Sequence, residues 1–248
     1  MPVRILNLSA YAFVALDRLA ERRDTLYHQA LAKQLKGTVL LAEEGINLVI
    51  AGVECQVREW LGGLRADPHL AALQVKESWS DAQPFRHLRV KVKPEIIRMN
   101  QPQLQPALGR APAVDALTLR RWLSAGVDDA GRKLLLLDTR NGFEVDAGAF
   151  DGAIDWRLGK FSDFPAALAT HRDELAGHTV VSYCTGGIRC EKATLAMREA
   201  GLEHIYQLDG GVLRYFETVP DAPHWHGRCF VFDERETIGT DLAPPQAA

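Results

Sequence analysis

Apolar and polar residues follow two different patterns along the chain, and the change falls near residue 100. Before it, apolar segments with strand-like alternation are interrupted by two longer segments with helical spacing. After it, short and continuously apolar runs are each followed by a helical segment. Continuous apolar runs are typical of buried parallel strands, whereas alternation is typical of antiparallel sheets with one covered face. The pattern therefore predicts two domains of different class.

The first pattern predicts an α+β domain over residues 1–99. We expect strands over residues 3–8, 38–42, 46–51, 73–79 and 88–93, and helices over residues 17–35 and 53–64. A turn at Glu43, Glu44 and Gly45 joins the second and third strands into a hairpin. Elements in the order βαββαβ are typical of the ferredoxin-like fold, which we predict for this domain.

The second pattern predicts an α/β domain over residues 114–235 with a mostly parallel sheet. We expect strands over residues 133–138, 153–156, 179–183 and 204–208, and helices over residues 118–125, 164–175, 189–201 and 212–217. Residues 100–113 contain three prolines and no periodicity, so we interpret them as a linker. We interpret residues 236–248 as a C-terminal tail.

Composition limits the classes of protein to consider. With 248 residues, 47% hydrophobic and 25% charged, the chain has the composition of a soluble globular protein. It contains neither a run of about 20 apolar residues nor a secretion signal, so we expect no membrane association. Four scattered cysteines favour a reducing cytoplasm over a disulfide framework. The net charge of -3 argues against nucleic-acid binding over the whole surface, but it is compatible with a local basic patch that binds nucleic acid.

The strongest chemical signal lies in residues 181–190, which read VSYCTGGIRC. A predicted strand ends directly before Cys184, and ligands of open α/β sheets bind at the carboxyl ends of strands. The N–H groups of a glycine-containing loop and the positive end of the next helix would lower the pKa of this thiol. The predicted active-site loop continues through Thr185, Gly186, Gly187, Ile188 and Arg189. A buried cysteine without function is the alternative, which the two glycines and the arginine disfavour.

Other residues are expected around this loop. Arg189 supplies a positive charge that can hold an anion or a persulfide beside the sulfur. Asp138, Arg140 and Asp209 follow the neighbouring strands, so we expect them at the same pocket, with Asp138 and Arg140 forming an ion pair. For Cys190, in the following helix, we favour a packing role, with a resolving thiol as the alternative. The remaining cysteines, Cys55 and Cys229, are interpreted as structural.

A basic run provides a second candidate. Its members are Arg86, Arg89, Lys91, Lys93 and Arg98. Alternate residues of a strand share one face, so three of these side chains would form a stripe that contacts nucleic-acid phosphates. A solvated strand face explains the run equally well. We predict no metal site, since the adjacent Glu43 and Glu44 at a hairpin turn are expected to face solvent.

The sequence resembles two known groups of proteins. Residues 184–189, with a cysteine and an arginine bounding a six-residue loop, resemble the active-site loop of rhodaneses. A narrower resemblance rests on several blocks in order. They are GTVLLAEEGIN at 37–47, LDTRN at 137–141, CTGGIRCEKA at 184–193 and CFVFDER at 229–235. Together these blocks resemble the tRNA uridine-34 hydroxylase family over nearly the whole chain.

The resemblance implies a ferredoxin-like domain followed by a rhodanese-like domain. It also implies C5 hydroxylation of the wobble uridine of tRNA to 5-hydroxyuridine, with the anticodon region as the binding partner and Cys184 as the essential residue. Dioxygen is the implied co-substrate. No cofactor is evident, because the sequence contains neither a two-His-one-carboxylate triad nor a dinucleotide fingerprint, so the electron donor is unidentified. The alternative is a sulfurtransferase that works through a Cys184 persulfide.

Overall fold

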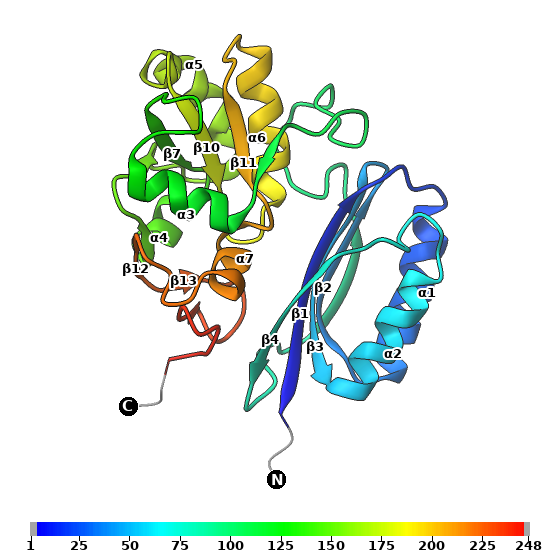
Figure 1. Ribbon diagram of the computed structural model, residues 1–248. Coiled ribbons are helices and arrows are strands. Elements are labelled where there is room, and N and C mark those ends of the chain that lie inside the picture. The colour runs from blue at the N-terminus through cyan, green and yellow to red at the C-terminus, as the bar shows by residue number, and fades with distance from the viewer. Residues whose placement is uncertain (1–3, 246–248) are drawn as a thin grey trace. The chain divides into compact units, whose positions relative to one another are not determined.

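The computed structural model describes residues 4–245, and the chain forms two compact units (Figure 1). The first unit comprises the chain up to Arg98 together with Phe232–Arg235. The second unit comprises Met99–Val231 and the chain from Glu236 onward. Each unit has its own hydrophobic core, as expected of separate domains.

The first unit is a five-stranded sheet with two helices. Its elements are β1 (Ile5–Phe13), α1 (Leu19–Ala32), β2 (Lys36–Ala42), β3 (Gly45–Val53), α2 (Glu54–Arg65), β4 (Val75–Ser80) and β5 (Leu88–Val92). The strand order is β4-β1-β3-β2-β5, in which β1 is antiparallel to both of its neighbours. The first six elements follow the order βαββαβ, so the predicted ferredoxin-like fold is confirmed. The fifth strand adds to the edge of the sheet, parallel to β2.

The alternation of the strands explains which face of this sheet is covered. In β1, Leu6, Leu8 and Ala10 are buried in the core that includes Trp60 of α2. Both helices lie against this one face of the sheet (Figure 1). The first strand is longer than predicted, because β1 stays paired with β3 as far as Phe13. Its polar residues lie on the other face, so they do not interrupt the pairing.

The second unit contains a five-stranded sheet in which all neighbouring strands are parallel. The strands of this sheet are β6 (Ala113–Val114), β7 (Leu134–Asp138), β9 (Ile154–Asp155), β10 (Thr179–Tyr183) and β11 (Ile205–Leu208), in the order β6-β11-β10-β7-β9. All five residues of the central strand β10 are buried. The predicted α/β class with a mostly parallel sheet is therefore confirmed.

Helices cover both faces of this sheet (Figure 1). They are α3 (Ala116–Ala125), α4 (Gly142–Val145), η1 (a 3-10 turn, Phe161–Asp163), α5 (Phe164–Leu175), α6 (Ile188–Glu199) and α7 (Gly211–Thr218). Helices α3 and α7 share a core with β10, whereas α5 packs beside α6. Two small antiparallel pairs complete the unit. They join β8 (Gly148–Phe150) to β12 (Trp225–Gly227) and β13 (Cys229–Phe230) to β14 (Thr237–Ile238).

Three segments lie elsewhere than the sequence pattern suggested. The expected linker 100–113 belongs to the second unit, where Leu104 and Ala111 are buried. The expected tail is part of the same unit as far as the described residues go, because Ile238 lies in its core and the Arg228 guanidinium donates to the Ala243 carbonyl. Residues 246–248 lie outside the described part.

The segment Phe232–Arg235, which the sequence places in the second domain, joins the first unit instead. Its Glu234 N–H donates to the Pro84 carbonyl, and its Arg235 guanidinium donates to the Ser78 hydroxyl. Short segments fixed by such polar contacts have no periodic signal, so the sequence pattern did not reveal them.

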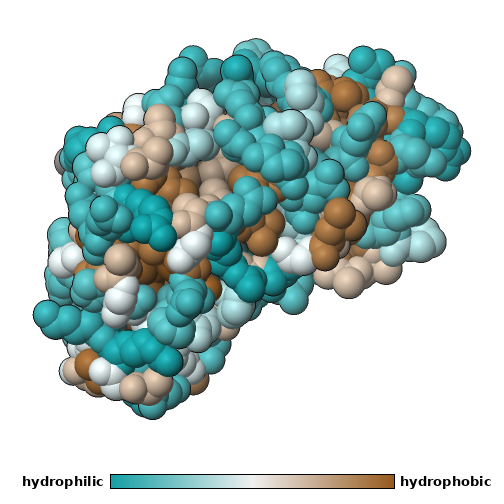
Figure 2. Space-filling model, turned by 90° about the horizontal axis from the view of Figure 1, so that it is seen from above, coloured by the Kyte–Doolittle hydropathy of each residue, from teal (hydrophilic) through white to brown (hydrophobic). Residues whose placement is uncertain are grey.

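The surface carries mixed polar and apolar side chains. Figure 2 shows a largely hydrophilic face with hydrophobic side chains in small separate patches. Scattered exposed apolar residues of this kind are normal for globular proteins. Within residues 4–245, no helix combines the length and the apolar character that crossing a bilayer requires.

Candidate active site

The sequence predicts that three strands of the second unit end near one another. Two of them, β7 and β10, do so. The last residues of β7 and β10, Asp138 and Tyr183, are paired in register, and Cys184 follows Tyr183 directly. The Thr139 N–H and hydroxyl both donate to the Tyr183 carbonyl, at 3.0 and 2.9 Å. This contact ties the end of one strand to the start of the loop that follows the other. Cys184 itself has no exposed surface.

The loop wraps its backbone around the sulfur of Cys184. The Gly187 N–H donates to Cys184 Sγ, with 3.1 Å between nitrogen and sulfur, and α6 begins at the next residue. Gly187 has a φ of 98°, a value that favours glycine. Because its N–H is at the start of α6, the sulfur lies at the positive end of the helix. Gly186 does not adopt a positive φ, so only one glycine of the pair has this geometry.

A third glycine holds the other side of the loop. The Val212 N–H donates to the Cys184 carbonyl at 3.0 Å, and this brings the first turn of α7 against the loop. A Cβ atom on Gly211 would lie 2.4 Å from the Cys184 carbonyl oxygen, and Gly211 also has a φ of 67°. The close packing of two backbones therefore requires a glycine at position 211.

The surroundings of Cys184 and Cys190 shift the pKa values of these two neighbouring thiols in opposite directions. Burial disfavours the Cys184 thiolate, but the hydrogen bond from Cys190 and the positive charge of Arg189 outweigh this effect. The backbone N–H groups at the start of α6 act in the same direction, so the pKa of Cys184 lies well below that of an ordinary thiol. Burial and the adjacent thiolate raise the pKa of Cys190 well above its usual range. Cys184 is therefore the thiolate and Cys190 the thiol of the pair.

Arg189 is held by a partner that the sequence analysis missed. Its guanidinium makes two bonds to the Glu144 carboxylate, of 2.6 and 2.8 Å, and Glu144 is fully buried. The arginine therefore supplies charge to the loop from a fixed position, and part of its donor capacity is already used. The predicted positive charge beside the sulfur is present, and its partner is an internal carboxylate.

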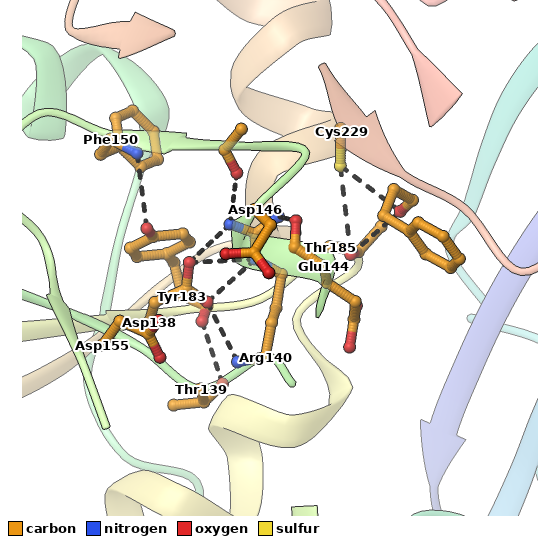
Figure 3. A network of polar contacts seen from close by, with 12 residues as sticks. Asp138, Thr139, Arg140, Glu144, Asp146, Phe150, Asp155, Tyr183, Thr185 and Cys229 are labelled. Atoms are coloured by element: carbon orange, nitrogen blue, oxygen red, sulfur yellow. Dashed lines mark hydrogen bonds and ion pairs between the residues drawn. The ribbon is translucent and has the colours of Figure 1, made fainter. Parts of the chain in front are cut away.

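Asp138 and Arg140 form a second buried ion pair (Figure 3). Arg140 Nη2 lies 2.5 Å from Asp138 Oδ2 and 2.7 Å from the Gly148 carbonyl oxygen. The guanidinium also lies over the rings of Tyr183 and Trp225. Asp138, Arg140 and Tyr183 are buried, so the pair fixes the end of β7 in the interior and does not line an open pocket.

Glu144 joins the two pairs. Its main-chain carbonyl accepts a hydrogen bond from Arg140 Nη1, and its side chain accepts from the Asn141 N–H at 3.0 Å. The sequence contains one signal for this role, since Asn141 and Glu144 have the spacing of a helix-capping box. The helix α4 that they begin is only four residues long, which is too short for hydrophobic periodicity to reveal it.

The remaining predicted residues lie around this centre or away from it. The Thr185 hydroxyl donates to the Phe230 carbonyl, and Ile188 is the first residue of α6. Cys229 is buried in the apolar core, which raises its pKa to about 12, whereas Cys55 is exposed on α2. Asp209 is half exposed and pairs with Arg110, so it is not part of the buried cluster.

The basic run lies on the first unit. Arg89 and Lys91 are exposed on the edge strand β5, and they alternate with Leu88 and Val90, which pack against the core on the helix-covered side. Their side chains therefore project from the opposite face of the sheet. Lys93 and Arg98 are also exposed, and Arg86 is paired with Glu234.

Comparison with protein families matches each half of the chain. Residues 5–96 match the model described as a UPF0176 acylphosphatase-like domain, and residues 119–218 match the rhodanese-like domain model. A protein from Variovorax paradoxus named tRNA uridine(34) hydroxylase is 60% identical over 96% of this chain and 90% of its own length. The chain belongs to the tRNA uridine(34) hydroxylase family.

Other members are similarly close. Proteins of the same name from Bordetella petrii and Burkholderia ambifaria are 58% and 52% identical, each over 98% of this chain and over 96% and 86% of their own lengths. Solved structures resemble parts of the chain. A rhodanese-like domain from Anabaena is 21% identical, covering 47% of this chain and 80% of its own, with a TM-score of 0.38. A human single-domain sulfurtransferase is 25% identical, covering 44% and 97%, with a TM-score of 0.35.

The Cys184 thiolate makes a testable prediction about pH. As pH falls, the ultraviolet absorbance assigned to Cys184, obtained by subtracting the titration of Cys184→Ser, should persist well below the pKa of about 8.5 for a free cysteine. The sign follows from the lowered pKa, since the group stays ionised until pH falls through that value. Cys55→Ser, at an exposed position, should leave this midpoint unchanged. A midpoint at or above the ordinary thiol value would show that the loop does not stabilise the thiolate.

Proposed function

We propose that this chain hydroxylates C5 of the wobble uridine of tRNA, and that Cys184 is the group that reacts with the base. The observation that supports this most directly is the buried thiolate at the start of α6, in a chain that aligns over 96% of its length with a named tRNA uridine(34) hydroxylase. A thiolate is a strong nucleophile, and its environment here keeps it ionised at neutral pH.

The thiolate can activate the target carbon by addition to the pyrimidine ring. C6 of uracil is electrophilic because it is conjugated with the C4 carbonyl. Addition of Cys184 at C6 would place the electron pair at C5, which then becomes nucleophilic. Nucleophilic catalysis of this kind divides a difficult substitution into easier steps. The N–H of Gly187 and the charge of Arg189 would receive the thiolate again when it leaves.

Dioxygen is the proposed source of the hydroxyl oxygen. Conversion of uridine to 5-hydroxyuridine by dioxygen consumes two further electrons and two protons, and it produces one water. The overall reaction therefore needs a reductant besides the two substrates.

The proposed partner is the anticodon region of tRNA. A base inside the anticodon stack cannot reach a buried sulfur, so the wobble uridine must leave the stack at a cost of a few kcal/mol. The exposed side chains of Arg89, Lys91 and Lys93 are proposed to contact the phosphate backbone. We expect the enzyme to act in the cytoplasm, where tRNA is present.

The alternative function, sulfur transfer through a Cys184 persulfide, uses the second unit alone. The relatives named as hydroxylases align with both units, which favours the hydroxylase.

Nucleoside analysis of tRNA tests the proposed function. In cells that lack this protein and any parallel route to the same nucleoside, 5-hydroxyuridine should be absent. The wild-type chain should restore it and Cys184→Ser should not, because serine is not ionised at neutral pH. Quantitative mass spectrometry of digested tRNA provides the measurement. If the wild type leaves the nucleoside profile unchanged, the sulfurtransferase alternative gains and a persulfide on Cys184 should be sought.

The basic strand makes a separate prediction about binding. Lys91→Gln should weaken tRNA binding at low salt and reduce the slope of log affinity against log salt by about one, since one phosphate contact is lost. Arg23→Gln removes the same charge from α1 on the helix-covered side and serves as the matched control. Fluorescence anisotropy over a range of salt concentrations measures both. Equal effects of the two substitutions would show that β5 is not a specific contact.

A further inference from the structure

The proposed function assigns no role to Cys190, the cysteine nearest to the reactive sulfur in the sequence. Cys190 is fully buried in the first turn of α6 and is hydrogen-bonded to Cys184. Its surroundings differ from those of a packing cysteine. Cys229 is buried within the apolar core cluster, whereas Cys190 Sγ lies 3.6 Å from the Thr139 hydroxyl. Cys190 is thus a buried thiol beside a hydroxyl group, one turn of the chain away from a thiolate.

We propose that Cys184 and Cys190 together form the immediate two-electron donor of the hydroxylation, and that each turnover converts them into a disulfide. This inference rests on the proposed function, because it assigns the source of the two electrons that the reaction requires. Two thiols oxidised to one disulfide release two electrons and two protons, which is the deficit of the overall reaction. An external dithiol reductant then restores the pair by thiol–disulfide exchange.

The first steps attach oxygen to the base. The Cys184 thiolate forms a bond to C6, and the electron pair of the C5–C6 double bond moves to C5. C5 then forms a bond to dioxygen, and the resulting peroxide takes up a proton to give a C5 hydroperoxide. At this stage the uracil carries both oxygen atoms and is still linked to the enzyme through Cys184.

The next steps return the base to aromatic conjugation and oxidise the pair. Cys190 attacks the terminal oxygen, the O–O bond breaks, and the products are a C5 hydroxyl group and a sulfenic acid on Cys190. The C5 proton leaves, the C6–S bond breaks, and the Cys184 thiolate is released. This thiolate attacks the sulfur of Cys190, a disulfide forms, and the sulfenic oxygen leaves as water after protonation. The sum is one dioxygen, one uridine and two thiols giving 5-hydroxyuridine, one disulfide and one water.

The structure supports this sequence in two respects. The two cysteines are held at the same turn of the chain, because the Gly187 N–H donates to Cys184 Sγ and the Gly187 carbonyl accepts from the Cys190 N–H, each at 3.1 Å. A sulfenic acid on Cys190 therefore has a thiolate nearby and can condense before further oxidation occurs. Both sulfurs are shielded from solvent, so neither the hydroperoxide nor the sulfenic acid is exposed to competing reactions in water.

Cys190→Ser separates a redox role from a positioning role. Serine keeps a hydroxyl donor for the hydrogen bond to Cys184, but it cannot reduce a peroxide or form a disulfide. We expect the variant to retain the low titration midpoint of Cys184 and to lose 5-hydroxyuridine formation in cells by roughly 100-fold, the size of effect seen when a catalytic group is removed. Cys55→Ser is the matched control and should behave as the wild type.

The redox role can also be tested on the wild-type enzyme, by counting the disulfides formed during the reaction. Fully reduced enzyme, given tRNA and dioxygen without reductant, should form one disulfide between Cys184 and Cys190 for each 5-hydroxyuridine made, as counted by alkylation and peptide mass spectrometry. Addition of a dithiol should restore turnover.

Three results would overturn the inference. They are normal 5-hydroxyuridine levels with Cys190→Ser, product formed while both thiols stay reduced, or loss of activity accompanied by a rise of the Cys184 midpoint to the ordinary value. The last result would give Cys190 only a positioning role. Absence of 5-hydroxyuridine with the wild type itself would instead refute the proposed function, so the two failures are distinguishable.

Discussion

The ion pair between Glu144 and Arg189 is the interaction on which the rest of the site depends. Both side chains are buried, and removing one partner of such a pair typically costs about 3–5 kcal/mol because the other charge is left uncompensated. Glu144 also accepts a hydrogen bond from Arg140 through its carbonyl, so the pair connects the end of β7 to the start of α6. Together with the hydrogen bond from Cys190, the guanidinium that this arrangement fixes beside the sulfur allows the negative charge of Cys184 to be tolerated in the interior.

The same arrangement explains why one thiol is reactive and the next is not. Two arginines and two carboxylates balance one another, so the thiolate adds a single negative charge to a neutral group of side chains. The backbone N–H groups at the helix start and the thiol of Cys190 stabilise that charge. At Cys190, burial and the adjacent thiolate raise the pKa, and they outweigh the effect of the neighbouring hydroxyl groups. The pair is therefore prepared for chemistry in which one sulfur attacks and the other supplies a proton or electrons.

Hydrophobic periodicity was sufficient to predict both fold classes and most of their elements. The segments 164–175 and 179–183 were predicted with the bounds that the structure shows, because long amphipathic helices and continuous buried strands give clear signals. The parallel arrangement also predicted that the ends of β7 and β10 would meet. The sequence did not reveal Glu144, because α4 is one turn long and the residue acts through a buried charge contact. It also misplaced Phe232–Arg235, which is held by individual polar contacts.

An RNA with 5-fluorouridine at the wobble position shows whether the Cys184 thiolate bonds to the target uracil. Fluorine at C5 cannot leave as a cation, so the bond between the sulfur and C6 cannot be resolved by the forward reaction. We expect the wild-type enzyme to form a covalent complex, which mass spectrometry maps to the peptide containing Cys184. The Cys184→Ser variant should form no such complex. An enzyme that hydroxylates the unmodified RNA yet forms no such complex would contradict this expectation.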